Sequence, residues 1–358
     1  MPTPWRISFF SLLFSVVSVA SVVPSFAYDP VTPGVALEFP RDRGAHPGHR
    51  IEWWYVTGHL ESQRGPLGFQ VTFFRVRNPE AEASPSRFAP KQIVFAHAAL
   101  ADPAAGRLLH DQRSARELPP LVEARQGETH VRIDDWSLAR DTDSYRTKVA
   151  GADFTLELAM TPTQPVMLQG ERGFSRKGAL GAQASYYYSE PQLRVSGRVT
   201  ARGVAAEVSG VAWLDHEWSS ELLASEASGW DWLGANLDDG GALMAFRIRS
   251  REGATLWSTA TLRPREGPVT TLDSAQVSFA ARRTWKSPRT GTTYPVAMDV
   301  RIGNRTWRVE PLLDDQELDA RASTGTLYWE GAVRMQADDG TRARAYLELT
   351  GYAERVPF

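Results

Sequence analysis

The sequence predicts an all-β protein made of two similar antiparallel β-barrels packed together. Three observations predict this fold: short runs of alternating or β-branched residues recur along the chain, turn signals separate them, and one stretch of the first half recurs in the second. The chain has 358 residues, which is more than the usual domain size of about 100 to 200 residues. Its length therefore favours two domains.

Runs with the pattern of strands follow one another at short intervals. They cover residues 54–60, 69–76, 93–101, 154–160, 193–200, 206–213, 243–248, 254–262, 296–302, 305–312, 327–335 and 343–350. Turn signals rich in glycine and aspartate lie at 63–66, 238–241 and 338–340. A serine cap at the start of residues 219–228 leaves open a short helix or an irregular segment there.

An internal repeat supports a duplication. Residues 53–60 (WWYVTGHL) align without a gap with residues 230–237 (WDWLGANL), at an offset of 177. Further along, residues 74–77 (FRVR) align with residues 246–249 (FRIR) at an offset of 172. The difference falls in the turn between the two segments, where insertions are tolerated. Two matches in the same order make a duplication the better interpretation.

The closing strands offer a third match, between residues 208–210 (VSG) and 349–351 (LTG). We expect an N-terminal arm at 28–48, one barrel domain at 49–219 and a second at 220–358. Each half has enough strands for one small barrel, of the size that holds a small ligand.

The first segment has the pattern of a secretory signal peptide. Arg6 precedes an apolar run at 7–23, and the small-x-small triplet 25–27 predicts cleavage after Ala27. The alternative is an uncleaved anchor helix, but the run is short for a membrane span and is diluted by serine. We expect residues 1–27 to be removed and the mature protein to be secreted, periplasmic and soluble, with at most peripheral contact with a membrane.

The composition excludes several kinds of site. The chain has no cysteine, which rules out disulfides, cysteine-ligated metals and a thiol nucleophile. A net charge of −2 gives no field that would attract nucleic acid, so we expect no nucleic-acid partner. His46 and His49, in a His-Pro-Gly-His segment, could hold a metal or form a loop or latch. We favour the loop and expect no metal.

The segment from Trp213 to Trp218 (WLDHEW) places three ionisable residues between two tryptophans. In an extended strand alternate residues share a face: Trp213, Asp215 and Glu217 on one side, and Leu214, His216 and Trp218 on the other. One interpretation is an acid–base group on the wall of a cavity, where apolar surroundings raise the pKa of a carboxyl. The other is a structural junction in which the charges satisfy the backbone and the tryptophans pack two barrels together.

Several motifs together resemble the carotenoid 1,2-hydratase/AttH lipocalin-like family. They are residues 52–55 (EWWY), 69–74 (FQVTFF), 187–189 (YYS), 210–218 (GVAWLDHEW) and 348–352 (ELTGY). The resemblance runs from about residue 47 to the C-terminus. It implies two tandem lipocalin-like antiparallel β-barrel domains packed together, in agreement with the duplication.

The resemblance also implies two kinds of function. Some family members hydrate carotenoid end groups; others are exported AttH-type proteins encoded with ABC-transporter components. We expect a protein that binds or hands over a hydrophobic, lipid- or terpenoid-like ligand, with an ABC-transporter permease as a candidate partner. The alternative is a hydro-lyase of the carotenoid 1,2-hydratase type, and cyclisation of a lipid-like substrate ranks below both.

Hydration of an alkene without a cofactor needs an acid that protonates carbon, aromatic faces that stabilise the cation, and a base that positions water. The candidate catalytic residues are Asp215 or Asp231 as acid and His216 or Glu217 as base. The candidate ligand-binding residues are Trp53, Trp54, Tyr55, Tyr187, Trp213, Trp218, Trp230 and Trp232. The same aromatic residues would also line a pocket that only holds an apolar ligand. No cofactor is expected.

Overall fold

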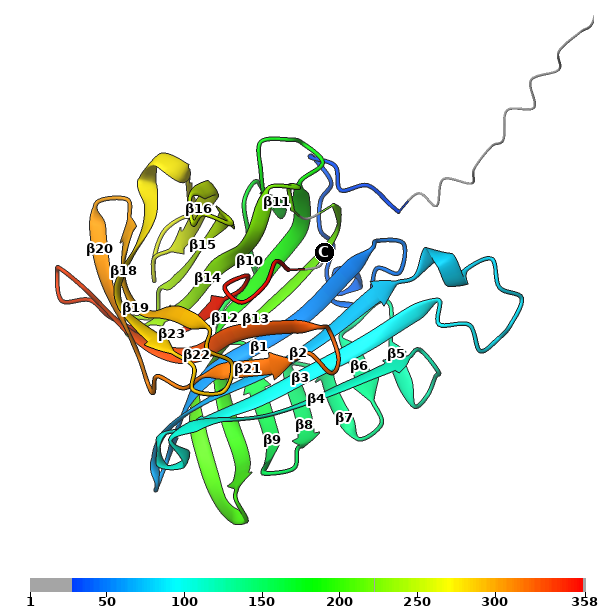
Figure 1. The fold of residues 1–358 in the computed structure, drawn as a ribbon, viewed down its shortest axis with the longest axis horizontal. Coiled ribbons are helices and arrows are strands. Elements are labelled where there is room, and N and C mark those ends of the chain that lie inside the picture. Colours follow the sequence, from blue (N-terminus) through cyan, green and yellow to red (C-terminus); the bar gives the residue numbers. More distant parts are fainter. Residues whose placement is uncertain (1–27, 222, 357–358) are drawn as a thin grey trace, which may run out of the picture.

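The computed structural model describes residues 28–221 and 223–356. The predicted signal peptide, residues 1–27, lies outside the described residues. The described chain forms two antiparallel sheets of thirteen and ten strands; the first curls into a nearly closed barrel and the second into a half-barrel (Figure 1). The predicted fold class, two packed lipocalin-like barrels, is confirmed. Within the described residues no helix is long and apolar enough to cross a membrane.

The first sheet contains β1 (Ile51–Ser62), β2 (Gly65–Arg77), β3 (Gln92–Asp102), β4 (Arg107–Arg116), β5 (Val122–Ala124), β6 (His130–Ile133), β7 (Trp136–Asp141), β8 (Ser144–Ala150), β9 (Phe154–Thr161), β10 (Met167–Leu168), β11 (Phe174–Arg176), β12 (Ala184–Ala201) and β13 (Val204–Glu221). The second contains β14 (Ala227–Leu237), β15 (Ala242–Ser250), β16 (Thr255–Arg263), β17 (Thr270–Leu272), β18 (Val277–Lys286), β19 (Thr293–Ile302), β20 (Arg305–Pro311), β21 (Glu317–Ala320), β22 (Thr326–Ala337) and β23 (Arg342–Leu349). Short 3-10 turns are η1 (Arg41–Arg43), η2 (Pro79–Ala81), η3 (Pro103–Ala105) and η4 (Ser274–Gln276).

The two sheets share one connection order, as the sequence repeat predicts. In the first sheet the neighbours run β2-β1-β13-β12, and in the second they run β15-β14-β23-β22. The repeated segments 53–60 and 230–237 therefore lie on equivalent strands, β1 and β14, each paired with the last strand of its own sheet. The chain crosses from one sheet to the other between Glu221 and Ala227. The domain limits 49–219 and 220–358 stay a prediction.

The third sequence match is wrong in register. Gly210 pairs with Leu60 across β13 and β1. Leu60 aligns with Leu237 in the repeat, and Leu237 pairs with Ala343. The structural equivalent of Gly210 is therefore Ala343, and not Gly351 as the match between 208–210 and 349–351 implies.

The helix considered for residues 219–228 does not form. Strand β13 continues to Glu221, and β14 begins at Ala227, with a turn between them. Ser219 pairs with Ile51 of β1, and Glu221 pairs with Ala184 of β12. Pairing on both sides of the strand outweighs the weak local preference for a helical cap.

Each barrel has its own core, and a third apolar cluster joins them. Trp136 and Phe69 belong to the first core, and Trp307 and Trp329 belong to the second. The third cluster lies between the sheets and contains Tyr55, Met167, Tyr187, Trp213, Ala227, Trp232, Ala242, Met244, Phe246, Ile248, Ala332 and Tyr346. Large aromatic residues from both repeats thus form the contact between the barrels, in a chain that has no cysteine for disulfides.

The predicted arm, residues 28–48, packs on the first barrel. Leu37 and Phe39 of the arm contact its core, and the Phe39 ring meets the Tyr188 ring edge-on at 5.0 Å. The Arg43 guanidinium lies 3.2 Å from the buried carboxylate of Glu190. The arm therefore supplies both apolar packing and a counter-charge to the inside of this barrel.

Candidate functional site

A cavity lies between the two sheets, outside the cores of both barrels. It holds about 1100 Å³ of empty space, its open mouth included. Its aromatic lining comes from both repeats: Trp53, Tyr55, Phe74, Trp230, Trp232, Phe246 and Tyr328. These residues alternate along their strands with residues of the barrel cores, as Trp232 does with Leu233. The cavity thus belongs to the contact between the barrels.

The side chains of the Asp-His-Glu segment point alternately to the two faces of strand β13, as the sequence predicted, and so lie in two different compartments. Asp215 and Glu217 line the cavity, whereas His216 lies on the opposite face, inside the first barrel. The register with β1 places Tyr55 beside Asp215 and Trp53 beside Glu217. The acids and the aromatic residues of the two strands therefore share one wall.

Asp215 is a buried carboxyl surrounded by hydrogen-bond donors. The Tyr187 hydroxyl donates to Oδ2 at 2.5 Å, and the Ser189 hydroxyl and the Trp213 indole N–H donate to Oδ1 at 2.5 and 2.6 Å. Burial raises the pKa of Asp215 to about 7, although the three donors favour the ionised form. The Trp232 indole N–H donates to the Tyr187 oxygen at 3.0 Å and so links this group to the second sheet. Asp215 can therefore hold or release a proton near neutral pH.

Glu217 is paired with a buried lysine. The Lys177 ammonium lies 2.8 Å from its Oε1, which also accepts a hydrogen bond from the Ser185 hydroxyl. The same ammonium lies 4.2 Å from the ring centroid of Phe246 and 4.8 Å from that of Tyr187. The cavity wall thus already holds one cation between a carboxylate and aromatic rings.

Two further acids, Glu330 and Glu348, line the cavity from the second sheet. They are cross-strand partners on β22 and β23; Glu330 is buried and Glu348 is half-buried. Burial and the neighbouring charge of Glu348 raise the pKa of Glu330 well above its usual range. Burial raises the pKa of Glu348 to about 7, while the Trp230 indole partly opposes this by hydrogen bonding. Neighbouring like charges disfavour double ionisation, so the pair retains a proton at neutral pH.

Sequence reasoning missed Glu330 and Glu348, although the repeat contains the signal for one of them. Asp215 pairs with Tyr55, and Glu348 pairs with Trp232. Tyr55 aligns with Trp232 in the repeat. Asp215 and Glu348 are therefore equivalent positions, and the correct register of the closing strands would have placed an acid at both.

His97 is a third residue that the sequence did not identify. It lines the cavity from β3, and its Nδ1 and Nε2 lie 2.7 Å from the Tyr328 hydroxyl and 2.9 Å from the Ser323 hydroxyl. Burial lowers the pKa of His97 to about 3, so the ring is neutral at physiological pH. Tyr328 lies on β22 and Ser323 in the turn before it, so His97 ties the first sheet to the second repeat.

Asp231, the other candidate acid, is not among the residues that line the cavity. It lies on the opposite face of β14 from Trp230 and Trp232, and its carboxylate oxygens are 2.7 Å from Arg247 and 2.8 Å from Arg249. The Tyr352 hydroxyl donates to it at 3.0 Å. The structure therefore separates Asp231 from the other candidate catalytic residues.

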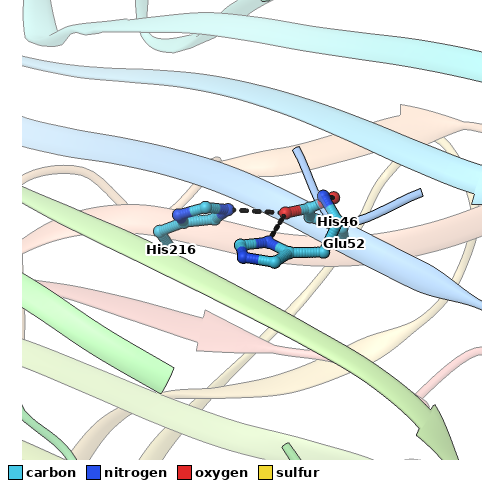
Figure 2. Close-up of side chains that lie close together, drawn as sticks. All are labelled: His46, Glu52 and His216. Carbon is cyan, nitrogen blue, oxygen red and sulfur yellow. Dashed lines mark hydrogen bonds and ion pairs between the residues drawn. The ribbon is translucent and has the colours of Figure 1, made fainter. Parts of the chain in front are cut away.

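His216 belongs to a buried network inside the first barrel (Figure 2). Its Nε2 lies 2.8 Å from Oε1 of Glu52, and His46 Nδ1 lies 2.7 Å from the same oxygen. Burial alone would raise the pKa of Glu52, but the charge and hydrogen bond of His46 and the hydrogen bond of His216 hold it well below its usual range. Arg75 also contacts the carboxylate, at 2.9 Å.

The network of His46, Glu52 and His216 is the one group of described residues whose ligand atoms are close enough for a metal ion. Each of these atoms already has a protein partner, and the guanidinium of Arg75 would repel a cation at Glu52. The arrangement fits a structural anchor better than a metal centre: the arm residue His46 is tied to two strands of the barrel.

The eight candidate ligand-binding residues fall into three places. Trp53, Tyr55, Trp230 and Trp232 line the cavity. Tyr187 and Trp213 lie behind its wall and donate to Asp215. Trp54 and Trp218 lie inside the first barrel, where they stack on His216 at 4.7 Å and on His46 at 3.8 Å.

Comparison with known proteins identifies the chain's relatives. The AttH-like family model matches residues 30–352. The crystal structure of a Nitrosomonas europaea protein assigned as an AttH matches with a TM-score of 0.85 and 55% identity, over 90% of this chain and 99% of that chain. Kievitone hydratase from Nectria haematococca matches with a TM-score of 0.68 and 14% identity, over 91% of this chain and 96% of that chain, which shows a shared fold alone. No curated protein sequence matches.

Proposed function

This chain belongs to the AttH-like family, and we propose that it binds a largely apolar small molecule in the cavity between its two barrels. The observation that carries the proposal is the cavity itself, which has aromatic side chains from both repeats and a few buried polar groups. Ligand sites in proteins typically have this composition, a mostly apolar and aromatic lining with a small number of polar groups.

Titration with the apolar fluorophore N-phenyl-1-naphthylamine tests this proposal. We expect saturable binding at one site, with energy transfer from the cavity tryptophans. Trp230→Ala, which removes a ring from the wall, should weaken binding at least about tenfold. Trp285→Ala is the matched control, because Trp285 packs beside the second core and is not among the residues that line the cavity. Equal weakening in both variants, or no saturable binding, would contradict the proposal.

We also propose that the protein is exported to the periplasm and hands its ligand to the permease of an ABC transporter. The signal-like segment 1–27 and the resemblance to exported family members support this step. Protein recovered from the periplasm should begin at Tyr28, and cross-linking there should recover a permease. A cytoplasmic protein that retains Met1, or cross-linking that captures no permease in the presence of ligand, would contradict it.

A second candidate function is hydration of an alkene in the same cavity. Asp215 supports it, because a buried carboxyl with a pKa of about 7 can protonate carbon beside aromatic rings that stabilise the cation. A water molecule would then add to the cation and lose a proton to the carboxylate form of Glu348. Acyclic terpenoids or carotenoids should give a tertiary alcohol, and Asp215→Asn should abolish its formation while leaving N-phenyl-1-naphthylamine binding intact. Unchanged turnover in Asp215→Asn would contradict the role of Asp215.

A further inference from the structure

The acids of the cavity outnumber its bases. Five acids line it, Asp215, Glu217, Glu330, Glu348 and Glu354, against two cationic residues, Lys177 and Arg355, and the neutral base His97. Lys177 is already engaged by Glu217 at 2.8 Å. No ion pair joins Asp215, Glu330 or Glu348 to a base within the described residues. The interior of the cavity therefore has carboxyl groups without counter-charges.

One of these carboxyl groups also has a free acceptor. Oε1 of Glu330 is buried and accepts no hydrogen bond of good geometry among the described residues. The hydroxyls of Tyr55 and Tyr328 lie close enough to Glu330 to oppose part of the rise in its pKa, but they do not satisfy this oxygen fully. A buried carboxyl oxygen without a donor costs free energy that a donor on a ligand would recover. Glu330 is among the residues that line the cavity.

The aromatic residues around the acid pair suit a positive charge. Trp232 pairs with Glu348 across β14 and β23, and its ring meets the Tyr55 ring edge-on at 5.2 Å. Aromatic faces attract ammonium groups, most strongly where water is excluded. The same cavity already shows this arrangement for Lys177, whose ammonium lies over Phe246 and Tyr187 and beside Glu217.

We propose that the ligand is an apolar molecule with an ammonium group, which lies between Glu330 and Glu348 and against the rings of Tyr55 and Trp232. This inference rests on the proposed binding function and names its ligand class. A primary ammonium would donate to the free oxygen of Glu330, and a quaternary ammonium would rely on charge and on the rings. Binding converts a carboxylic acid of the pair to a carboxylate, and the proton that it loses passes to the solvent.

Three probes with the same decyl chain test the inference: decyltrimethylammonium, decanol and decanoate, each below its aggregation concentration. Displacement of N-phenyl-1-naphthylamine reports their affinities. The ammonium should bind at least about tenfold more tightly than the alcohol. Glu330→Gln and Glu348→Gln, which keep the side-chain shape, should remove most of this difference. The control Glu266→Gln, at an exposed residue that is not among those that line the cavity, should retain it.

A measurement on the unchanged protein avoids any effect of the variants on folding. In weakly buffered solution near pH 6, binding of decyltrimethylammonium should acidify the medium, and binding of decanol should not. Equal affinities of the ammonium and the alcohol would overturn the inference and leave the apolar binding function standing. Preference for decanoate would assign the anchoring role to Lys177 and would also overturn it. If no probe displaces the fluorophore and the fluorophore itself does not bind, the binding function falls as well.

Discussion

Asp215 shows what the sequence can predict about a single residue. The two-residue period of a strand was enough to place Asp215 and Glu217 on the face opposite His216. The period does not reveal which face meets the second barrel, so His216 remained a candidate base. No sequence motif marks Glu330. Its raised pKa depends on burial and on the charge of Glu348, which lies on another strand, and neither can be seen in the residues beside it in the sequence.

Replacement of Asp215 by Asn tests the raised pKa through folding stability. Asp215 has an ordinary pKa of 3.8 when unfolded and about 7 when folded, so between these values the folded state binds more protons. The stabilising contribution is complete below pH 3.8 and is lost as the pH rises through 7. The free energy of unfolding should fall by up to about 1.4 kcal/mol per pH unit from this group. Urea unfolding from pH 4 to 8 should show a shallower fall in Asp215→Asn; an unchanged slope would contradict the assignment.

Asp231 should behave as a structural residue. Asp231→Asn removes the charge that pairs with Arg247 and Arg249 inside the second barrel. Loss of one partner of a buried ion pair typically costs about 3 to 5 kcal/mol, because it leaves charge uncompensated. Chemical denaturation should show a loss of this order, with unchanged affinity for N-phenyl-1-naphthylamine at temperatures where the variant is folded. A fully stable variant with impaired binding would instead place Asp231 in the binding machinery.

At the scale of elements, the strands with the strongest apolar runs were predictable. Each of the twelve predicted runs falls in a strand to within one residue, whereas β4 to β8, β18 and the short strands β10, β11, β17 and β21 were missed. Strand β8 shows why: buried Tyr145 and Val149 alternate with exposed Arg146 and Lys148, and the charged residues obscure a short pattern. The helix considered at 219–228 does not form, because pairing with strands distant in the sequence, and not the local sequence, determines the end of β13.

The contact between strands β2 and β22 offers a test of the domain interface. A Cβ atom on Gly68 would lie 2.4 Å from the Cβ atom of Ala332, so Gly68→Val forces the two sheets apart. Overpacking of this kind costs about 1 to 3 kcal/mol, and the melting temperature should fall. Gly181→Ala is the control, since nothing lies within 4 Å of its added Cβ. Equal melting temperatures for both variants would show that the sheets do not meet closely at Gly68.

At the scale of the whole molecule, the duplication explains where the cavity lies. Equivalent strands β1 and β14 bring Trp53 and Tyr55 of one repeat, and Trp230 and Trp232 of the other, to one shared space. The last strands β13 and β23 add the equivalent acids Asp215 and Glu348. The sequence predicted two barrels and an aromatic site. It could not predict that the site lies between the barrels, because contacts between domains leave no local period in the sequence.

The most direct measurement is a crystal structure of the protein with N-phenyl-1-naphthylamine bound. Binding in the cavity predicts density for the probe between β1 and β14, in contact with Trp53 and Trp230 and close to Glu348. Density inside either barrel core, or a probe bound only on the outer surface while the cavity holds water alone, would contradict the proposal that this protein carries its ligand between its two repeats.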